Sequence, residues 1–126
     1  MKKIFFILMY LMSSLGGRTQ TTVEKFIELK DSNIVKVVSF DINGGTKAIH
    51  CVVNSFLSRG ELSFKMVDPE GKSEGSFWLD TINDGKHKPS SGRMTHEVKL
   101  PIQGKWTLQI KTTDATGNLS YTVNID

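Results

Sequence analysis

Apolar and polar residues alternate along most of the chain after residue 20, a period of two that is typical of half-buried β-strands. Residues 104–112, GKWTLQIKT, show it without a break: Trp106, Leu108 and Ile110 share one parity, and polar residues fill the other. This parity predicts that Trp106 belongs to the core. The pattern predicts about eight strands, over residues 22–29, 34–42, 48–56, 61–67, 76–82, 94–100, 105–112 and 119–125.

Turn-forming residues separate these segments, roughly one group every dozen residues. Residues 43–45 read NGG, and residues 68–71 read DPEG, with proline and glycine where a type I turn favours them. Residues 58–60, SRG, and 114–118, DATGN, are expected to turn the chain as well, and residues 83–92 form the longest loop. No helical period competes with these signals after the N-terminal segment. The pattern therefore predicts an all-β fold, an antiparallel two-sheet sandwich of jelly-roll type.

The N-terminal segment has the composition of a secretory signal. Lys2 and Lys3 precede an apolar run at residues 4–12, and small residues follow it. The run is shorter than the roughly 20 apolar residues that a membrane-spanning helix needs. The pattern predicts a signal peptide over residues 1–17 and a secreted or periplasmic protein with no membrane span after its removal. The alternatives are a buried N-terminal helix or an uncleaved anchor.

The remaining residues, 18–126, are short enough for one domain, and 38% hydrophobic and 23% charged residues are ordinary for a globular protein. The formal net charge is +3. Removal of Lys2 and Lys3 from the 16 basic residues leaves 14 against 13 acidic ones, a net charge of +1. The basic residues that remain are interleaved with acidic ones. This distribution argues against a nucleic-acid-binding protein, which presents a clustered basic face.

No catalytic motif occurs in the chain: there is no Gly-x-Ser-x-Gly, His-Glu-x-x-His or phosphate-binding loop. The three histidines, His50, His87 and His96, fall on separate elements. The one cysteine, Cys51, shares the parity of its apolar neighbours, which predicts a buried structural thiol. We therefore expect no enzyme and no zinc site, and a grafted hydrolytic site is the least favoured alternative.

Metal binding is weighed from the acidic and amide residues in the turns. Calcium needs six to eight oxygen ligands from a compact loop, and no Asp-x-Asp-x-Asp spacing occurs. Such residues also form turns through their own backbone. No cofactor is expected, and a structural calcium would find its best ligands in Asp80 and Asp84. The other oxygen-bearing turn residues are Asp68, Glu70, Asn83, Asp114 and Asn118.

Neighbouring aromatic residues give the best candidate for ligand binding. Phe77 and Trp78 are adjacent, so one ring faces outward if the strand is regular. A flat ring beside polar loop residues could stack on a sugar while its neighbours bond the hydroxyl groups. The alternative is that Trp78 packs in the core and Phe77 covers an edge. The predicted ligand-binding residues are Trp78, Phe77, Asp80, Asn83, Asp84 and His87.

Three stretches, SFDINGGTKAIHCVV, GELSFKMVDPEGK and GKWTLQIKTTDATGNLSYTVNI, resemble the pre-peptidase C-terminal domains that follow secreted bacterial proteases. They are also similar to the P-domain of subtilisin-like convertases, in which Gly-x-Trp-Thr-Leu is followed by Asp and a glycine-led return strand. The resemblance covers most of residues 36–126. It implies a jelly-roll-like sandwich in a secreted protein without an active site. The matching residues are Gly104, Trp106, Thr107, Leu108, Asp114 and Gly117.

The function expected from these observations is that of an exported, non-catalytic module. Its partner would be a glycan or an extracellular protein, bound through Trp78 and residues 83–92. The alternative is a structural subunit of the envelope or of a secretion system, which assembles through strand edges. The least regular predicted strand, residues 22–29, would provide such an edge.

Overall fold

The computed structural model describes residues 21–83 and 86–126, so the predicted signal peptide lies outside the described residues. All strand pairs in this part are antiparallel. No helix that could cross a membrane occurs within these two ranges. The strands are β1 (Thr21–Ser32), β2 (Val35–Ile42), β3 (Ala48–Val67), β4 (Ser73–Asp80), β5 (Ile82–Asn83), β6 (Lys86–His87), β7 (Ser90–Lys99) and β8 (Gly104–Ile125).

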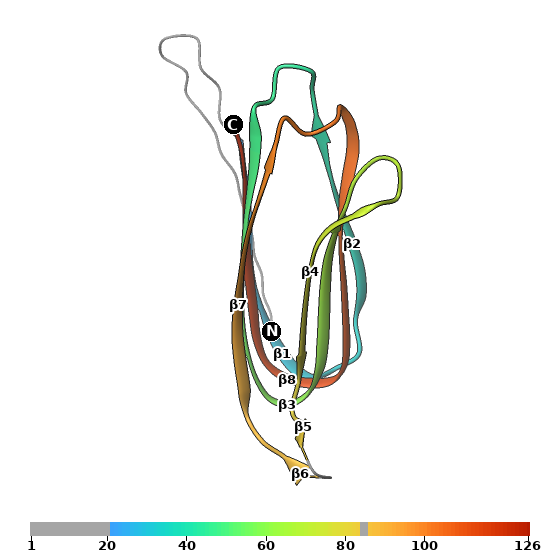
Figure 1. Cartoon of the computed structure of the whole chain (residues 1–126). Coiled ribbons are helices and arrows are strands. Elements are labelled where there is room, and N and C mark those ends of the chain that lie inside the picture. Colours follow the sequence, from blue (N-terminus) through green and yellow to red (C-terminus); the bar gives the residue numbers. More distant parts are fainter. Residues whose placement is uncertain (1–20, 84–85) are drawn as a thin grey trace.

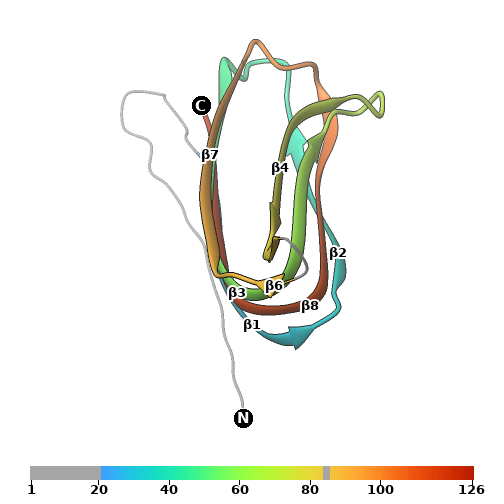
Figure 2. The same cartoon turned by 60° about the horizontal axis from the view of Figure 1, so that its bottom comes forward.

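Two long strands, β3 with 20 residues and β8 with 22, form the centre of the fold. They pair along almost their whole length, from Ile49↔Ile125 to Val67↔Thr107, and both bend midway (Figure 1). The bend folds the sheet back on itself into two layers (Figure 2). Layer 1 has the order β1-β8-β3-β7 and layer 2 the order β2-β8-β3-β4, with one half of each long strand in each layer.

This pairing is that of a jelly roll. The chain pairs β1 with the end of β8 and β2 with its beginning, while β7 pairs with the beginning of β3 and β4 with its end. The predicted antiparallel sandwich is confirmed. The prediction of eight strands in the sandwich is not confirmed, because residues 48–56 and 61–67 belong to one strand, β3, and residues 105–112 and 119–125 to another, β8. The main sheet has six strands, and β5 and β6 form a separate two-stranded sheet.

The long strands β3 and β8 bend at two positions where the sequence predicted turns. The register of β3 against β8 shifts between Leu57 and Glu61, and Gly60 has φ +92°. On β8, Gly117 has φ +149°. Positive φ kinks a strand without ending it when the partner strand is kinked at the same level. Residues 58–60 and 114–118 therefore redirect both strands from one layer to the other instead of reversing them.

The core lies between the two layers and is built from the inward parity of each strand. Trp106 is buried, its Nε1 donates a hydrogen bond to the Ile102 carbonyl at 2.9 Å, and its ring stacks on Phe40 with centroids 6.4 Å apart. The prediction that Trp106 is a core residue is confirmed. Residues that share the core include Leu29, Ile49, Cys51, Val53, Leu62, Phe64, Met66, Leu108, Leu119, Tyr121 and Val123.

Cys51 is fully buried in this core, as its parity predicted, and burial raises the pKa of its thiol to about 11. Because the thiolate is the reactive form, we expect the folded protein to resist alkylation at pH 8. The same reagent should label Cys51 completely in denaturant. Mass spectrometry after iodoacetamide treatment measures the difference, and rapid labelling under native conditions would contradict this placement.

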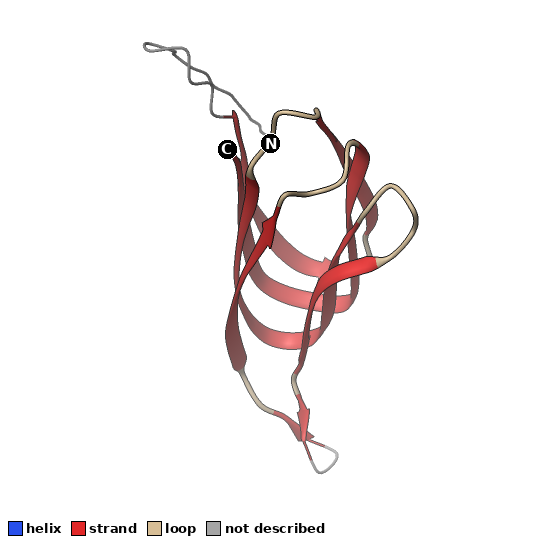
Figure 3. Cartoon of the chain, turned by 45° about the horizontal axis from the view of Figure 1, so that its top comes forward, coloured by secondary structure: helices blue, strands red, loops and turns tan. Residues whose placement is uncertain are grey.

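The two ends of the sandwich differ in the segments that they carry. The connections at residues 43–47, 68–72 and 100–103 meet at the end away from the bends (Figure 3). The short hairpin of β5 and β6 lies at the bend end and carries the chain from layer 2 to layer 1. Residues 83–92, predicted as one long loop, thus contain parts of three strands. Asn83 ends β5, Lys86 and His87 form β6, and β7 begins at Ser90.

Candidate binding surfaces

Trp78 lies on β4, an edge strand of layer 2, and stands in the solvent with 64% of its surface exposed. Alternation along β4 turns Phe77 inward, where it packs against the core and lies close to Gly92 of layer 1. A Cβ at Gly92 would approach the Phe77 ring to 3.0 Å. The prediction that one ring of the pair faces outward is confirmed, and Trp78 is the outward one.

The side chains around Trp78 on the outer side of layer 2 are polar. Ser63 is its partner on β3, and the pairs Glu61↔Asp80 and Lys65↔Ser76 flank it on the same parity. Directly opposed side chains on one face lie about 5 Å apart. We call these side chains the Trp78 face: a flat, exposed ring with hydroxyl, carboxylate and ammonium groups on a single plane of the sheet.

The other predicted ligand-binding residues follow Trp78 in the chain. Asp80 accepts a hydrogen bond from the Ile82 N–H at 2.8 Å, which uses one carboxylate oxygen in a local turn. Asn83 belongs to β5 and His87 to β6. Asp84 lies outside the described residues. The structure thus brings Asp80 and Trp78 together on one strand, and the part of the predicted site beyond Asp80 stays a prediction.

Two of the acidic residues weighed as metal ligands, Asp68 and Asp114, accept hydrogen bonds within the protein. One Asp68 carboxylate oxygen accepts from the N–H groups of Glu70 and Lys72, at 2.8 and 2.9 Å. Asp114 accepts from the Asn33 amide at 3.1 Å. Within residues 21–83 and 86–126, no three His, Cys, Asp or Glu side chains gather as a metal site. The Asp80 and Asp84 calcium site remains an untested hypothesis.

Two of the histidines, His50 and His96, lie on opposite sides of layer 1. The His50 Nε2 faces a Glu97 carboxylate oxygen at 3.4 Å on the outer side, and both side chains are partly exposed. His96 is half-buried on the inner side and contacts Gly75 of β4. It is the β7 partner of Cys51, but burial raises the pKa of that thiol, the opposite of what a nucleophilic cysteine needs.

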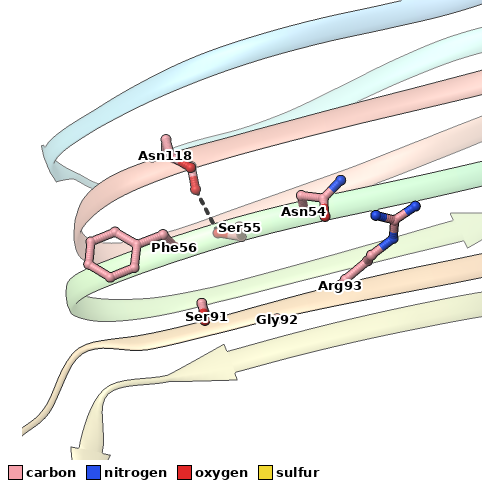
Figure 4. A pocket seen from close by; sticks show the side chains of 7 residues that line it. All are labelled: Asn54, Ser55, Phe56, Ser91, Gly92, Arg93 and Asn118. Atoms are coloured by element: carbon pink, nitrogen blue, oxygen red, sulfur yellow. Dashed lines mark hydrogen bonds between the residues drawn. The ribbon is translucent and has the colours of Figure 1, made fainter.

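The outer side of layer 1 carries a hollow that the sequence analysis did not foresee (Figure 4). Its volume is about 410 Å³, and it is shallow and widely open to solvent. Phe56, 43% exposed, contributes the one aromatic ring of the lining. The residues that line it are Asn54, Ser55, Phe56, Ser91, Gly92, Arg93 and Asn118.

The register explains why a hollow forms there. Across β8, β3 and β7, Phe56 lies between Asn118 and Ser91, and the next row places Asn54 between Ser120 and Arg93. Small residues beside a large ring leave space next to it. The hollow, named here the Phe56 hollow, therefore combines one ring with amide, hydroxyl and guanidinium groups.

The floor of the Phe56 hollow is held in place from below. Ser55, which points to the buried side, donates a hydrogen bond to the Asn118 carbonyl at 2.7 Å and ties β3 to β8. Gly92, its partner on β7, has the same inward parity, so only its backbone borders the hollow. One feature of the sequence could have indicated this site. Phe56 is an aromatic residue on the outward-facing parity of residues 48–56, where a side chain is exposed to solvent.

The comparisons with known proteins do not assign the chain. No family model matches it, and no curated protein matches either, so the resemblance to pre-peptidase C-terminal domains and P-domains is not confirmed. Similar solved structures include a disulfide-linked pilus of Bacillus endospore appendages, with 13% identity over 93% of this chain and 97% of the other and a TM-score of 0.45. Another is dimeric latent PorU from Porphyromonas gingivalis, with 11% identity over 82% of this chain and 12% of the other and a TM-score of 0.44. A third is infectious bursal disease virus, Gx strain, with 12% identity over 93% and 36% and a TM-score of 0.39.

Proposed function

We propose that the chain is an exported, non-catalytic jelly-roll module that binds a glycan on the outer side of one of its layers. The observation that carries the proposal is the Phe56 hollow, in which an exposed ring lies beside several hydrogen-bonding groups. The Trp78 face is the second candidate surface for the same function. We rank it lower because the Phe56 hollow gathers more hydrogen-bonding groups around its ring.

The chemistry of a sugar suits this lining. One face of a pyranose ring presents C–H groups, which pack on an aromatic ring, while its edge presents hydroxyl groups. The amides of Asn54 and Asn118 each offer donors and an acceptor, and Ser91 adds a hydroxyl. All of these come from paired strands, so the lining is largely preformed, which lowers the entropic cost of binding.

Export rests on the sequence alone, on Lys2 and Lys3 before an apolar run. If the full-length chain is expressed in a bacterium with a standard secretion pathway, its N-terminal peptide should be removed near residues 14–17. Intact-mass analysis of the periplasmic or medium fraction measures this. Recovery of the uncut chain in the cytoplasm would contradict export.

A protein partner is the second candidate, favoured by exposed apolar side chains on β2. Val35 and Val37 are 80% and 59% exposed on this edge strand.

Addition of a strand from a partner is disfavoured at the same edge, because Lys25 of β1 and Lys36 of β2 occupy inward positions there. Burial, together with nearby Lys25, lowers the pKa of Lys36. A docked strand would have to desolvate both amines.

Light scattering coupled to size exclusion, together with cross-linking in the native host, tests for such a partner. A stable assembly that Val35→Ser and Val37→Ser dissolve would favour the structural candidate. The segment predicted as irregular, residues 22–29, is in fact regularly paired with β8, but its other side is open at the edge of layer 1.

A glycan array followed by calorimetry on the exported protein tests the main proposal. We expect Phe56→Ala to weaken binding at least about tenfold, because it removes the stacking surface, and Trp78→Ala to leave it unchanged. Each variant is the control of the other, since each removes one exposed ring. The reverse pattern would move the site to the Trp78 face, and no binding to any glycan would contradict the proposal.

A further inference from the structure

Arg93 and Phe56 mark two ends of the hollow. Phe56 is the partner of Ser91 and Asn54 is the partner of Arg93, so Phe56 and Arg93 are diagonal neighbours on adjacent strands. Both belong to the outward parity, and Figure 4 shows the guanidinium at the end away from the Phe56 ring, with the Asn54 amide between them. Diagonal side chains on one face lie about 7–8 Å apart. A saccharide chain that lies along the hollow with one unit stacked on Phe56 thus extends toward Arg93.

The Arg93 guanidinium has no carboxylate partner in the part of the chain that the structure describes. The close contacts between ionisable groups there include His50 with Glu97 and Lys72 with Glu74. An arginine presents a planar fork of N–H donors that fits a carboxylate with two parallel hydrogen bonds. A fork without a carboxylate partner at one end of the hollow is suited to an anionic group of the ligand.

Three acidic residues lie on the same side of layer 1, Glu24, Glu28 and Glu97, and none is a strand partner of Arg93. Glu97 is engaged with His50. Glu28 is exposed on β1, opposite Asn118, and lies beyond the far side of Phe56 from Arg93. A ligand in the hollow therefore has a positive group at one end and a negative group past the other, which favours one orientation of an acidic ligand.

We propose that the Phe56 hollow binds acidic saccharides that carry a carboxylate on the sugar ring, with Arg93 as the residue that binds the carboxylate. This inference rests on the proposed function and narrows it to a class of glycan. One sugar ring packs on Phe56, the carboxylate of a uronic acid unit further along the saccharide meets the Arg93 fork, and the amides of Asn54 and Asn118 bond hydroxyl groups.

Tetragalacturonate and its methyl ester are the probes, because esterification removes the charge of the carboxylates and leaves the sugar rings and their hydroxyl groups unchanged. Calorimetry with the exported protein should show binding of the acid and at least about tenfold weaker binding of the ester, as expected for loss of a charge-assisted pair. Arg93→Gln should remove the preference for the acid. Arg93→Lys, which keeps the charge but not the fork, should fall between the two.

Lys99→Gln is the matched control. Lys99 is exposed at the far end of the same strand and the same face, so this variant removes one positive charge without touching the hollow. It should bind as the parent does. An equal loss in both glutamine variants would overturn the proposal, since it would reflect only net charge, and so would equal affinity for acid and ester. Phe56-dependent binding of the ester alone, or of other neutral glycans, would overturn the acidic class and leave the proposed function standing.

Discussion

Gly117→Ala is expected to lower the free energy of unfolding by at least about 3 kcal/mol, one of the largest effects of any single methyl group in this chain. Gly117 has φ +149°, which L-residues rarely adopt, so alanine strains the backbone. Its Cβ would also overlap the Phe56 carbonyl oxygen and lie 2.8 Å from the Leu57 Cα. These are backbone atoms of β3 at the bend, and they cannot move without opening the pairing that joins the layers.

Gly60→Ala should act in the same way from the other strand. A Cβ there would overlap the Asp114 carbonyl oxygen and lie 2.6 Å from the Ala115 Cα, at φ +92°. Gly45→Ala is the control, because Gly45 lies in an open turn and its Cβ would meet only the Asn43 Oδ1, at 3.5 Å. Urea unfolding followed by circular dichroism measures all three. Stabilities within about 0.5 kcal/mol of the parent for Gly60→Ala and Gly117→Ala would show that the bends tolerate side chains.

Trp106→Ala is expected to cost about 3–5 kcal/mol, the range for removal of a large buried aromatic side chain. It leaves a cavity beside Phe40 and removes the hydrogen bond to the Ile102 carbonyl. Trp78→Ala removes the same side chain from a site that is 64% exposed, and should change stability by less than about 0.5 kcal/mol. Thermal unfolding of the two variants beside the parent provides the comparison.

Fluorescence checks the two placements independently of stability. In Trp78→Phe, the emission of Trp106 should be blue-shifted and poorly quenched by acrylamide until the protein unfolds. In Trp106→Phe, the emission of Trp78 should already be that of a solvated indole in the folded state. Equal quenching of the two tryptophans would contradict their assignment to core and surface.

The tryptophans also show how far sequence patterning reaches. Regular alternation over residues 104–112 placed Trp106 in the core, and the parity of Cys51 placed its thiol there as well; both predictions are confirmed. For Phe77 and Trp78, alternation required one ring outside and left open which one. That choice depends on which parity of β4 faces the opposite layer, and the pairing of β4 with β3 fixed it.

The candidate sites were less accessible to prediction. Trp78 and Asp80 are close in sequence, so the strand pattern already placed them together. The Phe56 hollow joins Asn54 and Phe56 of β3 to Arg93 of β7 and Asn118 of β8. No local pattern connects these residues, because only the register between distant strands makes them neighbours.

By itself, the sequence determined the class of the fold and the parity of its regular strands, since a period of two forces side chains to alternate between a dry and a wet side. Glycine at residues 60 and 117 signalled a break in direction, and the sequence could not distinguish a reversal from a bend, because a positive φ serves both. Because β3 pairs with β8 both before and after these glycines, the chain bends there and does not reverse. That pairing joins residues far apart in the chain, and it set the six-stranded sheet, the two layers and the surfaces that a ligand can reach.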